Sequence, residues 1–292
     1  MQLAARKEWG GALWVMPAFA FVVLFFVVPL VMCVVMSFYT WPLFGDNKFV
    51  AFRNYTSLFA DEQLLRSFCF TLLYTVLITP VIFIVAMALA LMVNRPGMAF
   101  LGFYRTAFFL PVVIGVSTSS LLWIWMLNDS VGVFNGILLS LGLIHQPIIW
   151  LGELKLALPS VIVSILWKTA GFSMILLLGG LQSIPGEIYE AARIDGCSAS
   201  SSFRMITLPL MKRTIAVTLL LSVIGSLLAF DQFYIMTSGR PANASVTIVY
   251  WIYINSFQKF RLGYGSAMSL AYLILLLGFC TLQLKSLSLN QE

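Results

Sequence analysis

The sequence predicts an all-α integral membrane protein with six transmembrane helices, and its composition and charge distribution are the two observations that predict it. Of 292 residues, 61% are hydrophobic and 10% are charged, whereas soluble globular chains have roughly 45–50% apolar and about 25% charged residues. In hydrocarbon every backbone N–H and C=O must be paired within the protein, so apolar stretches are expected to be helical despite their many Val, Ile and Phe residues. The composition excludes a disordered chain, a collagen, a disulfide scaffold and most cytosolic enzymes.

The long intervals without charge mark the expected spans in order. Four such intervals lie between Glu8 and Asp46, Arg66 and Arg95, Arg105 and Asp129, and Arg261 and Lys285. Two more apolar stretches are 156–186, interrupted only by Lys168, and 214–230, which ends before Asp231. Each can hold a helix of about 20 residues, the length needed to cross a bilayer. The predicted spans, within one transmembrane domain covering 1–292, are 12–37, 68–92, 106–127, 157–181, 214–236 and 263–284.

The N-terminal region is expected to be a retained first span. Arg6 and Lys7 precede an apolar run, as in a signal peptide. That run is longer than a signal core and no small-residue cleavage site ends it. A cytoplasmic N-terminus would place slightly more Lys and Arg inside than outside, which supports the orientation only weakly.

The sequence offers no catalytic or metal-binding constellation. Its four cysteines have no metal-ligand or CxxC spacing, and His145 is the only histidine. No GxxxxGK[ST] phosphate loop is present, so any ATP that the protein uses is expected to bind to another chain. The net charge of +6 comes from residues scattered between apolar runs, which predicts membrane-flanking loops and no nucleic-acid partner.

The connection between the fourth and fifth spans, residues 183–212, differs from the other loops. Pro185 fits a first helical turn, and Glu187 and Glu190 follow where the helix dipole favours negative charge. Gly196 suits a helix stop with positive φ. Ser198 is then expected to cap a second short helix, inside which Pro209 would be hard to accommodate. The segment therefore predicts a helix-turn-helix with a small, alanine-lined face.

The spacing within this segment resembles the EAA loop of ABC-importer permeases. Glu190-Ala191-Ala192 is followed by three residues, Gly196, nine residues and Ile206-Thr207-Leu208-Pro209. The resemblance implies a cytoplasmic coupling helix that docks into a groove of an ATPase, and hence two cytoplasmic termini. The residues to which it assigns ATPase coupling are Glu190, Ala191, Ala192, Asp195, Gly196, Ile206, Leu208 and Pro209.

Other motifs resemble a narrower family, the carbohydrate-uptake permeases of the maltose and glycerol-3-phosphate type. The chain departs from that pattern at Arg240, where a second Gly is usual, and at Ser245, where Thr is usual. The motifs that carry the resemblance are Ile184-Pro185, Arg193-Ile194-Asp195-Gly196, Phe230-Asp231, Thr237-Ser238-Gly239-Arg240-Pro241, and Tyr253 and Phe257 ahead of Gly263-Tyr264-Gly265-Ser266-Ala267.

The family resemblance implies a translocation subunit without its own ATPase site. The subunit would sit in a bacterial inner membrane, in contact with lipid, and import a sugar, oligosaccharide or related glycoside by alternating access. The implied partners are a second, homologous permease, two ATP-binding cassette subunits that hold ATP and Mg, and an extracytoplasmic solute-binding protein. No cofactor is expected in this chain.

Polar residues within two spans are the candidates for the solute pathway. Lys168, with Thr169 beside it, and Phe172 share a face of the fourth span, and Ser222 and Ser226 are four apart in the fifth. Aromatic surface with hydroxyl groups suits a sugar, and the resemblance places a central sugar site between the helices that flank the EAA loop.

Alternatives to each of these roles remain open at this stage. The hydroxyls can instead bond to their own helices or pack helix on helix, and Lys168 can reach the headgroups by snorkelling. Lys168 and Arg240 would suit an anionic glycoside, although a neutral one is expected.

Two other classes of protein are also compatible with the composition. A secondary solute transporter would usually show two similar halves with paired charges. A membrane enzyme acting on lipid-linked sugar would need interfacial carboxylates or a metal cluster. Neither pattern is evident in the sequence.

Overall fold

The computed structural model describes residues 14–95 and 100–288, and these residues form helices joined by loops, without a strand among them. Four of the described helices are long and apolar enough to cross a membrane, and two bent helix pairs raise the number to six if each pair is one span. The first two positions of the predicted span 12–37 lie outside the described residues. The four long helices are Trp14–Ser37, Glu62–Val93, Leu154–Gln182 and Leu262–Gln283.

The chain divides into two compact units, of which the first contains the described residues 14–62 together with Ile252–Leu275. Within it, the Asn54 side-chain amide donates hydrogen bonds of 2.8 Å to the carbonyls of Ser37 and Tyr39. These bonds satisfy carbonyls beyond the end of the first helix and hold the short helix that carries Asn54 against it. The helical elements of this unit are η1 (Val23–Val27), α2 (Val28–Ser37), α3 (Arg53–Phe59), η4 (Ile254–Gln258) and the first half of α14 (Leu262–Ser288).

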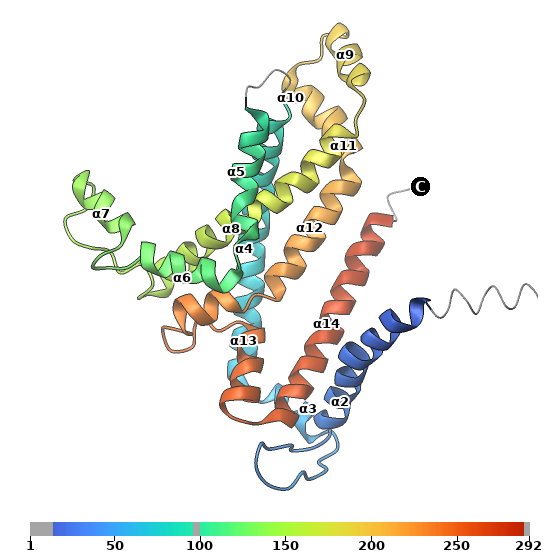
Figure 1. Ribbon diagram of the computed structural model, residues 1–292, viewed down its shortest axis with the longest axis vertical. Helices are drawn as coiled ribbons and strands as arrows, with labels where there is room; N and C mark the ends of the chain where they lie inside the picture. The colour runs from blue at the N-terminus through green and yellow to red at the C-terminus, as the bar shows by residue number, and fades with distance from the viewer. Residues whose placement is uncertain (1–13, 96–99, 289–292) are drawn as a thin grey trace, which may run out of the picture. The chain divides into compact units, whose positions relative to one another are not determined.

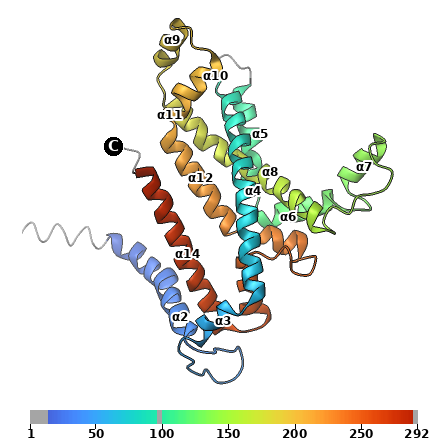
Figure 2. The ribbon, with the colours of Figure 1, turned by 180° about the vertical axis from the view of Figure 1, so that it is seen from behind.

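The second unit contains Gln63–Trp251 and the chain from Leu276 onward. Its longest complete helix, α8, packs against both α5 and α12. Figures 1 and 2 show α8 running from the side of α6 and α7 toward α11. The elements of this unit are α4 (Glu62–Val93), α5 (Leu101–Val113), α6 (Val116–Met126), α7 (Val133–Ser140), α8 (Leu154–Gln182), α9 (Gly186–Ile194), α10 (Ala199–Ser202), η2 (Phe203–Thr207), α11 (Leu208–Leu210), α12 (Lys212–Leu227), η3 (Phe233–Thr237) and α13 (Ile248–Tyr253), which continues into the first unit.

The region predicted as a third span, 106–127, is not one straight helix. The axes of α5 and α6 differ by 99°. Ile114 and Gly115, which join them, have extended backbone with ψ of 133° and 144°. Pro111 lies in the last turn of α5, and a proline there removes one backbone donor. The helix therefore ends after Val113 and restarts in a new direction.

The predicted fifth span, 214–236, is also interrupted. Helix α12 ends at Leu227, and helical structure returns only around η3. The Ala229 carbonyl in this gap accepts a hydrogen bond of 2.7 Å from Thr247 Oγ1. That side-chain donor supplies the partner that a continuing helix would have supplied.

Close approach of helices in the second unit depends on two glycines of α8. A Cβ on Gly171 would overlap the Phe108 carbonyl of α5, and one on Gly180 would lie 2.8 Å from the Thr214 side chain near the start of α12. Small residues at such positions let helix backbones approach within a membrane protein. Gly171 and Gly180 therefore set the spacing of α5 and α12 around α8.

A buried apolar cluster fills the space between α4 and α8 at the end of α8 that leads into α9. Its fully buried members include Val93 of α4 and Leu177 of α8. Ile184, Phe203 and Leu208, all from the segment after α8, pack against it. The helix-turn-helix segment is therefore anchored to two long helices.

Candidate functional site

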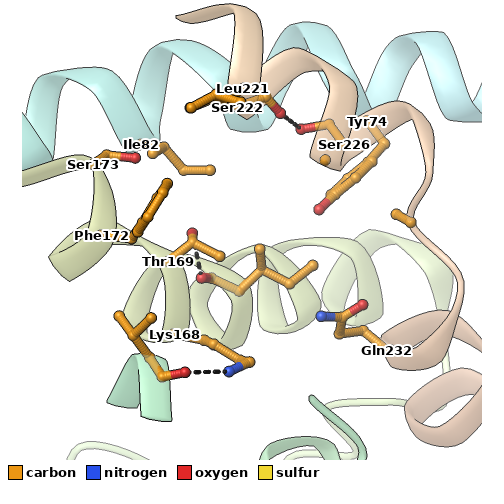
Figure 3. Close-up of a pocket in the computed structure, with 14 residues that line it drawn as sticks. Tyr74, Ile82, Lys168, Thr169, Phe172, Ser173, Leu221, Ser222, Ser226 and Gln232 are labelled. Atoms are coloured by element: carbon orange, nitrogen blue, oxygen red, sulfur yellow. Dashed lines mark hydrogen bonds between the residues drawn. The ribbon is translucent and has the colours of Figure 1, made fainter. Parts of the chain in front are cut away.

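A cavity of about 240 Å³, here named the α8 cavity, lies against the middle of α8 within the second unit. It is lined from α4, α8 and α12, from Val112 of α5, and from the chain that follows α12. Figure 3 shows side chains from these elements around it. All five residues predicted for the solute pathway line this cavity, namely Lys168, Thr169, Phe172, Ser222 and Ser226.

The Lys168 ammonium is directed at the end of α5. Lys168 is 8% exposed. Its Nζ donates hydrogen bonds to the carbonyls of Pro111 and Val112, each at 3.4 Å, and to that of Ile114. A lysine ammonium has three donors, so all three are used on the backbone. A positive charge at this helix end also complements the helix dipole.

This arrangement defines the role of Lys168 more sharply than its position in the sequence did. Its side chain is held inside the second unit by α5 carbonyls, so it does not reach toward headgroups as in the snorkelling alternative. The same bonds fix the break between α5 and α6. Lys168 thus shapes the cavity wall at Val112, and its charge is compensated by backbone dipoles.

The three predicted hydroxyl groups are hydrogen-bonded to their own helices. The Oγ atoms of Ser222 and Ser226 donate to the carbonyls of Thr218 and Ser222 at 2.9 and 2.7 Å. Thr169 Oγ1 donates to Ile165 at 2.8 Å. Each hydroxyl proton is therefore used within the helix, and each oxygen keeps acceptor capacity toward the cavity.

The sequence analysis missed other residues that line the α8 cavity, among them the polar Tyr74, Ser173 and Gln232. Tyr74 of α4 is almost fully buried, and its ring meets Phe233 edge-on with centroids 5.0 Å apart. Gln232 contributes an amide from the turn before η3. Figure 3 shows both among the side chains around the cavity. The sequence feature that could have predicted this role is Tyr74 itself. It is a polar aromatic residue within an apolar span, on the same face of α4 as Ile78 and Ile82.

The segment after α8 begins with α9, which ends as the sequence predicts. The Cys197 N–H bonds to the Ala192 carbonyl at 2.9 Å, and the Gly196 N–H bonds to that of Arg193 at 3.1 Å. This pair of bonds is a Schellman motif. Gly196 has φ of +76°, a conformation that glycine adopts without steric cost.

The second half of the segment also begins as predicted, but Pro209 lies within its helical structure and not beyond it. Ser198 Oγ caps α10 by accepting from the Ser201 N–H at 3.3 Å. The expectation that Pro209 would not fit inside this helix is wrong, because helical structure continues to Leu210. The π-helical turn η2, closed by the Leu208 N–H and the Phe203 carbonyl, precedes the proline and accommodates its missing donor. The chain then bends by 73° into α12.

A side-chain hydrogen bond joins the two halves of this segment. Tyr189 Oη of α9 lies 3.0 Å from Thr207 Oγ1 of η2. Thr207 is 4% exposed. The relative direction of α9 and the helix that follows is therefore supported by a partly buried polar contact.

The residues assigned to ATPase coupling divide between surface and interior. The expected alanine-lined face is split, because Ala191 is exposed and Ala192 is buried. Ile194 is 87% exposed on α9, which leaves an apolar side chain available at the surface. Of the other assigned residues, Glu190, Asp195, Gly196 and Pro209 are exposed, whereas Ile206 and Leu208 are half-buried.

Comparison with known proteins identifies the family to which this chain belongs. Residues 62–284 match the family model described as the binding-protein-dependent transport system inner membrane component. The chain belongs to this family. It is therefore a multi-pass permease subunit of an ABC importer, and the alternatives of a secondary carrier and of a lipid-linked-sugar enzyme are not favoured.

Individual relatives of this permease cover nearly its whole length. The lactose transport system permease protein LacF of Rhizobium radiobacter is 35% identical over 272 residues, which is 91% of this chain and 89% of LacF. A bacterial ABC transporter involved in the import of the acidic polysaccharide alginate matches with a TM-score of 0.87 at 25% identity, covering 100% of both chains. The alginate transporter in complex with its pentasaccharide-bound periplasmic protein matches with a TM-score of 0.84 at 25% identity, covering 97% of this chain and 95% of that one.

Proposed function

We propose that this permease forms the pathway through which an ATP-driven importer moves a sugar, oligosaccharide or related glycoside into the cell by alternating access. One observation carries the proposal: α8 lines the cavity with Phe172 and leads directly into the exposed α9. A single rigid helix thus connects a site of carbohydrate-compatible chemistry to a surface suited to a motor protein. The lactose and alginate relatives support the carbohydrate class.

The proposed solute is neutral. Phe172 and Tyr74 offer aromatic surface, and Gln232 and the serine oxygens offer hydrogen-bonding groups, as polyhydroxylated ligands require. Among the described residues, the only charged side chain that lines the α8 cavity is Lys168, which is already bonded to three carbonyls. An anionic solute would have to compete with those carbonyls for the ammonium.

In the proposed mechanism the segment 183–212 is the coupling element and faces the cytoplasm. Exposed residues of α9, among them Glu190, Ala191 and Ile194, would contact the ATPase. Gly196 and the half-buried Ile206 and Leu208 would hold the element in shape. This orientation places both termini on the cytoplasmic side of the inner membrane and treats 1–292 as one transmembrane permease domain.

The proposed assembly contains four cytoplasmic-membrane subunits and one delivery protein. A second, homologous permease would complete the pathway, and two ATP-binding cassette subunits would bind ATP and Mg. An extracytoplasmic solute-binding protein would deliver the sugar, as the periplasmic protein bound to the alginate transporter suggests. We propose no cofactor, ATPase site, catalytic residue or nucleic-acid partner for this chain.

Reconstitution of the complete complex in proteoliposomes tests this function. We expect Gly196→Val and Glu190→Ala to lower both sugar uptake and solute-stimulated ATPase activity, while Lys155→Gln, at an exposed position in the first turn of α8, serves as an unaffected control. Unchanged activity in both coupling variants would contradict the coupling role. Uptake by this chain alone, without an ATPase, would contradict the importer itself.

The solute is best identified through the cognate binding protein. A thermal-shift screen of that protein with lactose, trehalose, glucuronate and glycerol 3-phosphate separates neutral from anionic ligands. We expect stabilisation by a neutral glycoside. Stabilisation by the anionic compounds alone would contradict the proposed neutral class.

A further inference from the structure

A second cavity, of about 330 Å³, lies in the second unit, and it is here named the Trp150 cavity. Its walls come from the end of α6, the chain just before α8, and the region of η3 and the loop after it. The polar and aromatic side chains that line it include Asn128, Asp129, Trp150, Ser238 and Arg240.

The position of this cavity along α8 sets it apart from the α8 cavity. Ile149–Gly152 line it immediately before α8 begins, whereas 183–212 follow directly after α8 ends. A helix of 29 residues is about 43 Å long, which exceeds the roughly 30 Å hydrocarbon core. The Trp150 cavity and the coupling segment therefore lie on opposite faces of the membrane.

The two cavities are neighbours across one helical turn. Gln232, just before η3, lines the α8 cavity, whereas Ile235 and Met236 within η3 line the Trp150 cavity. Ser164 Oγ of α8 lies 3.4 Å from Met236 Sδ, next to Ile165 of the α8 cavity. The short stretch 232–236 thus contributes to the walls of both cavities.

Two walls of the Trp150 cavity are joined by one buried amide. Asn135 of α7 is 2% exposed. Its Nδ2 donates to the Asp129 carbonyl at 3.2 Å, and its Oδ1 accepts from Trp150 Nε1 at 3.1 Å and from the Ile148 N–H at 3.1 Å. The indole is thus fixed relative to Asp129 before any ligand arrives.

The third wall is held by buried hydroxyl groups. Ser245 Oγ is bonded to the Arg240 carbonyl at 2.7 Å and to Thr237 Oγ1 at 2.8 Å. Ser238 has φ of +52°, which is uncommon outside glycine and costs conformational energy. These hydrogen bonds fix the backbone of the loop that carries Arg240.

The charges at this cavity balance. Asp129 and Arg240 both line it, are exposed, and make no ion pair within the part of the chain that the structure describes. A carboxylate, a guanidinium and an amide beside an indole are donors and acceptors for vicinal hydroxyl groups, with an aromatic surface for the apolar face of a sugar ring. An anionic ligand would meet Asp129 as well as Arg240.

We propose that the Trp150 cavity is a second, outer binding site for a neutral saccharide, occupied before the solute passes η3 into the α8 cavity. The proposal rests on the importer function proposed above. In it, Trp150 provides the stacking surface, and Asp129 and Arg240 provide hydrogen bonds. The site is on the face where a solute-binding protein would release its ligand.

The direct test measures saccharide binding to the purified complete complex in nanodiscs without its binding protein. Saturation-transfer NMR with lactose as the neutral probe and glucuronate as the charged probe reports contact. We expect lactose signals that fall about fivefold in Asp129→Asn/Arg240→Gln, the effect of roughly one lost hydrogen bond. Lys155→Gln, which removes an exposed cation in the first turn of α8, should leave them unchanged.

Three results would overturn the proposal: lactose signals equal in the double variant and the wild type, no lactose signal at all, or a stronger signal from glucuronate. Both substituted side chains are exposed, so the variant complex is expected to assemble. Trp150→Leu supplies an independent second variant with the same expected loss.

A second measurement separates saccharide binding from docking of the binding protein. In the ATPase assay we expect the double variant to lower the maximal stimulated rate, with no change in the binding-protein concentration that gives half-maximal stimulation. The opposite pattern would assign this surface to protein docking and overturn the saccharide site. If the wild-type complex shows no solute-stimulated ATPase activity, the importer function itself fails, which is a distinct outcome.

Discussion

The hydroxyl of Tyr189 on α9 lies 3.0 Å from that of Thr207 on η2, across the turn that Gly196 closes. Eighteen residues separate the two side chains in sequence. Thr207 is buried and Tyr189 is half-buried, so this contact is partly shielded from water, where a hydrogen bond contributes more than at the surface. It determines the angle at which α9 projects from the helix behind it.

The first prediction concerns this hydrogen bond. Tyr189→Phe and Thr207→Val should each lower solute-stimulated ATPase activity while leaving basal activity in place, since α9 would keep its surface but lose its fixed direction. We expect losses of about three- to tenfold, equivalent to roughly 1 kcal/mol. The double variant should be no worse than the worse single variant. Additive losses would show that the two hydroxyls act independently.

The second prediction concerns Lys168. Lys168→Met would leave carbonyls at the end of α5 without their buried donor, so we expect the purified complex to lose about 1–3 kcal/mol of stability. The substitution Lys168→Arg keeps the positive charge and should retain part of that stability. Thermal unfolding monitored by fluorescence measures both. Full stability of Lys168→Met combined with a large rise in KM for uptake would instead assign the ammonium to the solute.

The third prediction concerns the approach of α5 to α8. Gly171→Ala would place a methyl group against the Phe108 backbone, and relief of such an overlap costs typically about 1–3 kcal/mol. Gly179→Ala is a matched control on the same helix, because no heavy atom lies within 4 Å of its added methyl group. We expect lower thermal stability in the first variant only. Equal stability of both variants would show that α5 moves away from α8 without cost.

The fourth prediction ranks the polar groups around the α8 cavity. Tyr74→Phe removes a hydroxyl from the cavity lining, and we expect it to raise the KM for uptake about fivefold, the effect of roughly one hydrogen bond. Ser226→Ala removes a hydroxyl whose proton is donated to the Ser222 carbonyl, so its effect should be under about twofold. Radiolabelled sugar uptake measures both. A larger effect of Ser226→Ala would reverse this ranking.

The apolar helices were predictable from sequence because charge is excluded from hydrocarbon whatever the tertiary structure. The interruptions within the predicted third and fifth spans were not, since hydropathy reports burial in lipid and carries no information on backbone dihedral angles. Pro111 and Gly115 were signals for the first break, because kinks usually occur at such residues. Leu228 offered no comparable signal.

The site was predictable only where its residues lie close together in sequence. Polar groups near Phe172 and Ser222 could be proposed from helical spacing, and the structure brings them into one cavity. Tyr74 reaches that cavity from a helix far away in sequence, which only the fold reveals. The partners of Lys168 are carbonyls 54 to 57 residues earlier, so its role required the three-dimensional arrangement.

The apolar cluster beneath the segment 183–212 has a mechanical consequence. Ile184, Phe203 and Leu208 pack against a buried cluster made mainly of α4 and α8 side chains, and close-packed interiors have low compressibility. A displacement of α9 is therefore transmitted through this cluster and is not absorbed by it. It is transmitted to both long helices, and these are the helices that carry Tyr74 and Phe172 of the α8 cavity.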